Sequence, residues 1–285
     1  MRSLTNREKR LLVLFSILLA ILAYDCWHRR WFPTITLESD HYVIYSTAGE
    51  SQTRLALNKM EVLCDRYNTF MAPLLTTMEN SQKLKLKLFK NRDEFRRCNR
   101  VVGWAEARYR KPYCYQYINE NEPSPFHWMI HEATHQLNEE IAQLKLKKWL
   151  NEGLATYFGT SLLDENKIQL GKVDTDTYPI WWIPTLNLSG DLEKDIQSDR
   201  IIPLDLIVRD KEGPNMRTHF NTYYIHWWSL THFCLHYNNS QYRDGFFNVI
   251  KEGGTQQSFE KHIGPINDIQ NKWYQYLQEK VKDYK

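Results

Sequence analysis

The chain has 285 residues, of which 42% are hydrophobic and 25% charged, enough apolar material for one large domain or two small ones, and this excludes overall disorder. A mean hydropathy of −0.60 excludes a polytopic membrane protein, and a net charge of +3 is too balanced to indicate a nucleic-acid partner. Ten histidines and an aromatic content of 14% permit a metal site but do not locate it.

The N-terminal segment, residues 1–30, has the charge order of a signal peptide or a membrane anchor. Four basic residues, from Arg2 to Arg10, precede the uncharged run Leu11–Tyr24. As a helix this run spans about 21 Å, less than the ~30 Å hydrocarbon core, so Tyr24, Trp27 and Trp31 are expected to assist as an interfacial belt. Candidate cleavage positions fit poorly. We therefore expect an uncleaved anchor that holds the following domain outside the cytoplasm, in a bacterial envelope or periplasm, with secretion as the alternative if the segment is cleaved.

Residues 31–122 are expected to form an α+β part. Alternation of apolar and polar residues predicts strands, and apolar residues recurring at three and four predict helices. The expected elements are a strand or hairpin at Ile35–Thr47, a helix from Ser51 to about Leu75, a strand at Leu84–Phe89, a short helix at Arg92–Asn99, and a hairpin or edge strand at Trp104–Ile118.

Five cysteines form neither a disulfide scaffold nor a paired metal motif. If the domain lies outside the cytoplasm, Cys98 and Cys114 are the first pair to test, because they flank the expected hairpin. Buried free thiols are expected for most of the five.

Residues 123–285 are expected to be mainly helical, with an irregular segment from about Leu170 to Met216. Ser124 as N-cap and Pro125 as first helical residue predict the start of a helix with one apolar stripe. A second helix is expected at Lys147–Thr160.

The helix that begins at Ser124 carries His131 and His135 one turn apart, with Glu132 between them. In this HExxH pattern the two imidazoles can share one Zn²⁺, and the glutamate can act as general base on a metal-bound water. Glu152 follows His135 by seventeen residues, enough for a turn and a second helix to return a carboxylate to the metal. Two histidines and one glutamate leave a fourth position open, as catalysis requires.

The segments His131–His135 and Trp149–Ala155 resemble the gluzincin metallopeptidases, the clan of thermolysin and the zinc aminopeptidases, and within it the peptidase MA-like family. The resemblance implies that His131, His135 and Glu152 bind zinc and that Glu132 is the general base. It also implies a thermolysin-like core, with a small mixed sheet whose edge strand lies beside the zinc helix, followed by a mainly helical part.

The segment Tyr223–Tyr237 is similar to the aromatic helix of these enzymes. The resemblance implies a residue that stabilises the oxyanion, for which Tyr224 is the first choice and Tyr223 and His226 are rivals. The alternative is a buried aromatic helix without a catalytic role. The terminal segment from Gly254 resembles the last helices of the family, with Phe259 and Trp273 as packing residues.

Two departures from the clan limit what the resemblance implies. An extended substrate is expected to add to the edge strand near Tyr113–Tyr117, but the Gly-x-Met-Glu-Asn motif of aminopeptidases is absent, which favours endopeptidase action. Thr156 stands where thermolysin-like enzymes place an aspartate that orients a zinc histidine, so that support must come from elsewhere.

Other histidines and tryptophans are given weaker roles. His127 is close enough in sequence to reach the site, but a polar residue near a helix start is the more common case. His219, His232, His236 and His262 are expected at the surface or the edge of the core. The loop Asp174–Asp191, with Trp181 and Trp182, either walls the cleft, touches the membrane, or packs on its own aromatics.

The sequence thus predicts a membrane-anchored zinc metallopeptidase that acts on peptides or proteins and binds no nucleic acid. The competing hypothesis is a non-catalytic, zinc-stabilised envelope protein for binding or assembly. Hydrolysis of another amide, such as a cell-wall cross-link, shares the same metal chemistry.

Overall fold

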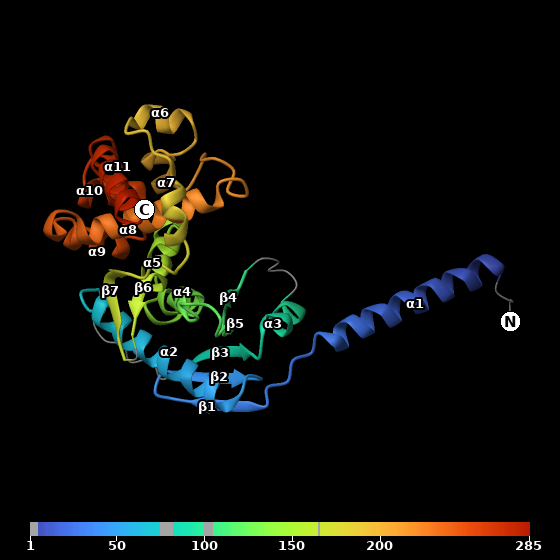
Figure 1. Ribbon diagram of the computed structural model, residues 1–285. Coiled ribbons are helices and arrows are strands. Elements are labelled where there is room, and N and C mark those ends of the chain that lie inside the picture. Colours follow the sequence, from blue (N-terminus) through green and yellow to red (C-terminus); the bar gives the residue numbers. More distant parts are fainter. Residues whose placement is uncertain (1–4, 75–81, 100–104, 165) are drawn as a thin grey trace.

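The computed structural model describes residues 5–74, 82–99, 105–164 and 166–285 (Figure 1). The basic Arg2 and the expected element ends at Leu75 and Trp104 lie outside these ranges. The described chain combines one small mixed sheet with many helices and one N-terminal apolar helix, so the expected mixture of helix and sheet is confirmed.

The N-terminal helix α1 spans Asn6–His28, and Thr5 and Glu8 close its first turn with a capping box. None of its residues is buried, and at 1.5 Å per residue it is about 35 Å long. It is therefore longer than the uncharged run alone, and it is long and apolar enough to cross a membrane, a property that a signal sequence shares.

The three aromatic residues expected to form an interfacial belt differ in their surroundings. Tyr24 and Trp27 are 69% and 66% exposed, as a belt requires. Trp31 instead packs on the domain, where its ring lies 4.9 Å from that of Phe89 and its Nε1 donates to Thr47. This contact satisfies the indole N–H within the protein, so Trp31 is not free to enter the membrane interface.

The sheet has the strand order β1-β2-β3-β5-β4. The strands are β1 (Ile35–Glu38), β2 (Tyr42–Ser46), β3 (Leu84–Phe89), β4 (Ala107–Arg110) and β5 (Tyr113–Tyr117). Both expected hairpins form, β1 with β2 and β4 with β5, while the β2–β3 and β3–β5 pairs are parallel. The sheet has β1 at one edge and β4 at the other, and β4 is the edge strand beside α4. The expectation that Tyr113–Tyr117 is the edge is wrong, because β5 is paired on both sides.

Different helices pack on the two faces of the sheet. Buried residues such as Leu86 alternate with partly exposed ones such as Lys87 along β3. The inner face packs on α2 (Glu50–Met71) and α4 (His127–Gln136), and α3 (Arg92–Cys98) contacts β3 and β5. Phe95 of α3 packs on the rings of Phe89 and Tyr117, two residues whose strand positions place them on the outer face.

Cys98 and Cys114, the pair that the sequence offered for a first test, are both free thiols. Cys114 is buried on the inner face, where its Sγ lies 3.2 Å from Oε1 of Gln136 on α4. Cys98 ends α3, which packs through Phe95 on the outer face. The sheet therefore separates the two sulfur atoms.

Residues 123–285 are mainly helical, as expected. The elements are α4, the π-helix η2 (Leu137–Ile141), α5 (Lys148–Gly159), β6 (Ser161–Leu163), β7 (Ile168–Val173), the 3₁₀ helix η3 (Ile180–Thr185), α6 (Leu192–Gln197), α7 (Leu204–Arg209), α8 (Phe220–Ser240), α9 (Arg243–Lys251), α10 (Gln256–His262) and α11 (Ile266–Asp283). The segment expected to be irregular contains the end of the β6–β7 hairpin and three short helices. Phe259 and Trp273 are fully buried packing residues, as predicted.

The helix α4 begins later than its sequence indicates. Its first residue is His127, and its N-cap Phe126 makes no side-chain capping bond. Ser124, the expected cap, donates its hydroxyl to Asp174 instead. The bond to Asp174, the residue that follows β7, therefore replaces the capping bond that Ser124 was expected to make within its own helix.

Two glycines bring α5 against its neighbours. A Cβ at Gly153 would lie 2.9 Å from the carbonyl oxygen of Trp227 on α8, and one at Gly159 would lie 3.0 Å from that of His127 on α4. The backbones of α4, α5 and α8 can approach only because these positions have no side chain. This packing determines where the polar side chains of the three helices meet.

Candidate metal centre

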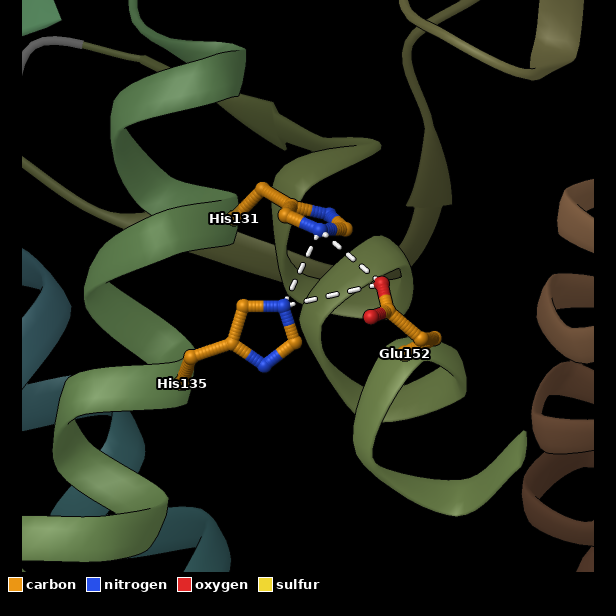
Figure 2. A group of neighbouring side chains, drawn as sticks. All are labelled: His131, His135 and Glu152. Carbon is orange, nitrogen blue, oxygen red and sulfur yellow. Dashed lines mark hydrogen bonds and ion pairs between the residues drawn. The ribbon is translucent and has the colours of Figure 1, made fainter. Parts of the chain in front are cut away.

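The helices α4 and α5 place two histidines and one glutamate around a common point (Figure 2). The Nε2 atoms of His131 and His135 lie 3.2 Å apart, and Oε2 of Glu152 lies 3.5 Å from the first and 3.6 Å from the second. The histidines meet because they are four residues apart on one helix. Glu152, the fifth residue of α5, reaches them from the second turn of that helix.

These separations fit a zinc ion. Ligands at ~2.0–2.1 Å in tetrahedral directions are about 3.3 Å from one another, which matches the three distances within a few tenths of an ångström. The donor set of two imidazole nitrogens and one carboxylate oxygen is also one that zinc uses in catalytic sites. The residues therefore fit a Zn²⁺ ion with one coordination position left for another ligand.

The electrostatics of the cluster favour a positive charge at its centre. Burial lowers the pKa of His135, but the carboxylate of Glu152, with smaller contributions from Glu132 and Asn151, outweighs burial and raises that pKa to about 9. Burial raises the pKa of Glu152, and the neighbouring imidazoles reverse this and hold the pKa well below its usual range. A carboxylate that is mostly shielded from solvent and lies beside two histidines thus needs a cationic partner, which either a proton or a metal ion provides.

Glu132 lies in the same cavity and is held by the edge strand. Its Oε2 accepts a hydrogen bond of 2.6 Å from the backbone N–H of Tyr109 on β4. The amide of Tyr109 therefore points away from β5, toward α4. The carboxylate that the sequence assigns as general base is therefore oriented by the outer edge of β4.

Tyr224 is the aromatic residue of α8 that reaches the cluster. Its Oη donates a 3.0 Å hydrogen bond to Oε2 of Glu152. Burial raises the pKa of Tyr224 well above its ordinary value, and the charge of Glu152 adds to this, so the phenol keeps its proton. The rivals point elsewhere: Tyr223 donates to the carbonyl of Pro214, and the fully buried His226 ring lies near Trp273.

The position that departs from thermolysin, Thr156, does not contact a histidine. Its hydroxyl donates to the carbonyl oxygen of Glu152. A chain of polar side chains joins three other elements near the cluster: Tyr67 donates to Asn138, which donates to Asn151. Sequence reasoning missed this chain, because its members come from α2, η2 and α5 and share no spacing pattern.

A cavity of about 590 Å³ contains the cluster. Its lining joins the edge strand, the zinc-binding candidates and η2: Tyr109, His131, Glu132, His135, Asn138, Glu139, Leu144, Lys145, Leu146, Asn151, Glu152 and Tyr224. The π-helix η2 supplies Asn138 and Glu139, and such irregular turns are frequent at functional sites.

The other histidines do not join the cluster. The Nδ1 of His127 lies 2.7 Å from the carbonyl oxygen of Ser124, and burial lowers the pKa of this imidazole to about 4. His232 is buried among rings of the core rather than at its edge, which corrects the expectation for that residue.

The loop Asp174–Asp191 packs partly on aromatic residues. Its Trp181, which is 45% exposed, contacts the rings of His127 and Tyr178.

One family model, described as a protein of unknown function (DUF1570), matches residues 127–260. The matched segment runs from the first residue of α4 into α10, so it contains His131, Glu132, His135, Glu152 and Tyr224. No curated protein matches the chain.

Proposed function

We propose that the protein is a zinc-dependent metallopeptidase of the gluzincin type, with a thermolysin-like core. The observation that carries this proposal is the convergence of His131, His135 and Glu152 at the spacing of a tetrahedral zinc site, in the cavity that also holds Glu132. A site that only stabilises the fold needs a closed set of ligands and has no use for Glu132 beside an open position.

In this proposal the chain's own residues divide the work of peptide hydrolysis. Zn²⁺ held by the two histidines and Glu152 would supply Lewis acidity and lower the pKa of a water in the open position. Glu132, oriented by the amide of Tyr109, accepts the proton of the attacking water and later delivers it to the leaving amine. Tyr224 donates its phenol proton in a hydrogen bond to the developing oxyanion, after turning from Glu152.

The edge strand β4 supports a peptide as the substrate. An extended segment beside Ala107–Arg110 would pair with main-chain groups that neither β5 nor Glu132 uses, and it would pass the cavity that holds the cluster. Main-chain pairing binds a peptide with little dependence on its sequence. Because the sequence lacks the aminopeptidase motif, we expect cuts inside the peptide rather than at its N-terminus. The domain would act outside the cytoplasm, anchored by α1.

Glu132→Gln tests the proposed role of the glutamate. Full-length protein purified in detergent should keep about one zinc per chain in this variant but lose peptide hydrolysis by a factor of about 10² or more. Glu193→Gln, an exposed carboxylate on α6, is the matched control and should keep the wild-type rate. A Glu132→Gln variant with full activity would contradict the mechanism. Zinc without turnover in wild type would support the non-catalytic envelope protein instead.

The cleavage mode is tested by digesting a peptide library with the full chain and mapping the new ends by mass spectrometry. Internal cuts support endopeptidase action, and stepwise trimming from the N-terminus contradicts it. Release of products only from cell-wall peptide cross-links would move the proposal to another amide with the same metal chemistry.

A further inference from the structure

The outer face of the sheet carries a patch of lysines and arginines interleaved with tyrosines. Strand register places Val43, Lys85 and Tyr113 in one row across β2, β3 and β5, and Tyr45, Lys87, Tyr115 and Arg108 in the next. Arg110 continues the first row on β4. These side chains lie opposite the buried positions of the same strands, so all of them point away from α2 and α4.

The cations of this face have no anionic partner in the described part of the chain. Lys85, Lys87, Arg108 and Arg110 form no ion pair there, while the nearby carboxylates Glu38 and Glu106 already pair with Lys83 and with Arg92. Four unpaired positive charges therefore share one sheet face. Such an arrangement is complementary to a surface of negative charge.

Tyrosine rings fill the space between these cations. The Lys87 Nζ lies 4.4 Å from the ring centre of Tyr113 and 5.3 Å from that of Tyr115, and the Tyr45 ring contacts that of Tyr113. The lysine ammonium groups therefore make cation–π contacts with the tyrosine rings. Tyrosine is a residue that membrane–water interfaces favour, because one end of its ring is apolar and the other polar.

The end of α1 is fixed at this same face. Arg97 of α3 donates to the carbonyl of His28, the last residue of α1, and Trp31 packs on Phe89 with the Lys87 ammonium 5.6 Å from its ring centre. Figure 1 shows α1 leaving the domain on the side of α3, away from α8–α11. A bilayer that contains α1 therefore begins within a few residues of the outer face of the sheet.

We propose that this outer face is a lipid-binding surface that rests on anionic headgroups of the membrane in which α1 is inserted. The inference depends on the membrane location of α1 but not on peptidase activity. Each lysine or arginine near an anionic bilayer is attracted to its surface, and four on one face act together to hold the sheet against the headgroups. Contact of this kind would fix the orientation of the catalytic cavity relative to the membrane.

The test uses the full chain in lipid nanodiscs, because α1 retains the protein in any bilayer and co-sedimentation would not discriminate. Lysine acetylation is measured by mass spectrometry in discs of phosphatidylcholine alone and in discs containing about a third phosphatidylglycerol. We expect acetylation of Lys85 and Lys87 to fall about five-fold or more in the anionic discs and to recover at about 1 M salt, where the Debye length is about 3 Å. The exposed lysines Lys251 on α9 and Lys272 on α11 are the matched controls and should not change.

A paired variant gives a second readout. Arg108→Glu with Arg110→Glu should restore Lys85 and Lys87 acetylation in anionic discs, whereas Lys251→Glu with Lys272→Glu should not, and circular dichroism checks that both fold. Equal acetylation of wild type in the two kinds of disc overturns the proposal. A single-stranded oligonucleotide that protects Lys85 and Lys87 from acetylation in neutral discs, together with no effect of phosphatidylglycerol, also overturns the proposal. That result would assign the face to nucleic acid. Failure of the protein to float with neutral vesicles would instead refute the insertion of α1.

Discussion

Gly153→Ala should loosen the contact between α5 and α8 that brings Tyr224 to Glu152. The added Cβ would lie 2.3 Å from Oγ1 of Thr231 and 2.9 Å from the carbonyl oxygen of Trp227. Overpacking of this kind costs about 1–3 kcal/mol, and replacing glycine inside a helix recovers about 1 kcal/mol. Because the Trp227 carbonyl belongs to the backbone and cannot rotate away, we expect a net loss of about 1–2 kcal/mol in the free energy of unfolding, or about 2–8 °C in Tm.

The assay for this effect is thermal unfolding of the full chain in detergent with a chelator present, so that bound zinc does not contribute. Thr231→Ala is combined with Gly153→Ala in a double-mutant cycle, since the Thr231 hydroxyl has no hydrogen-bond partner among the described residues. The double variant should be about 1 kcal/mol more stable than the sum of the single effects predicts. Additive effects, or a Gly153→Ala variant as stable as wild type, would refute the close approach of the two helices.

Three further predictions follow from particular contacts. Tyr224→Phe should lower kcat/KM about 10²-fold, with Tyr223→Phe as the matched control that keeps the wild-type value; equal effects in steady-state kinetics would remove the distinction between them. Asp195→Asn should cost about 2–3 kcal/mol in chemical unfolding at neutral pH, because this buried carboxylate accepts hydrogen bonds from Ser189, Arg200 and Tyr274. Burial raises the pKa of Asp195, but these hydrogen bonds outweigh burial and lower that pKa overall. The difference in free energy of unfolding between wild type and Asp195→Asn should therefore be complete above pH ~4, the pKa in the unfolded chain, and shrink as the pH falls below it. A constant difference down to pH ~2 would contradict this sign. Thiol titration of unreduced, unfolded protein should find five free cysteines. A result of only three free thiols would indicate one disulfide and contradict this prediction.

The polar cluster could be predicted from the sequence because its geometry is mostly local. His131 and His135 meet through the periodicity of one helix, and Glu152 returns on the next helix after a short connection. The hairpins and the strand at Leu84–Phe89 were predictable for the same reason, since alternation and turn residues act over a few positions.

Features that depend on tertiary packing could not be predicted. The amide of Tyr109 meets Glu132 only because β4, and not β5, is the edge strand on the α4 side of the sheet. Cys98 and Cys114 are sixteen positions apart but lie on opposite faces of that sheet, which no spacing rule indicates. Ser124 satisfies every local rule for a helix cap, yet Asp174 takes its hydroxyl.

The central claim is that His131, His135 and Glu152 form one zinc site. Its most direct test is the zinc content of the dialysed full-length chain, measured by mass spectrometry for wild type, Glu152→Ala and the exposed control Glu193→Ala. We predict about one zinc per chain in wild type and in the control, and a large loss in Glu152→Ala. A wild type without zinc, or a Glu152→Ala variant that binds zinc as wild type does, would contradict the assignment.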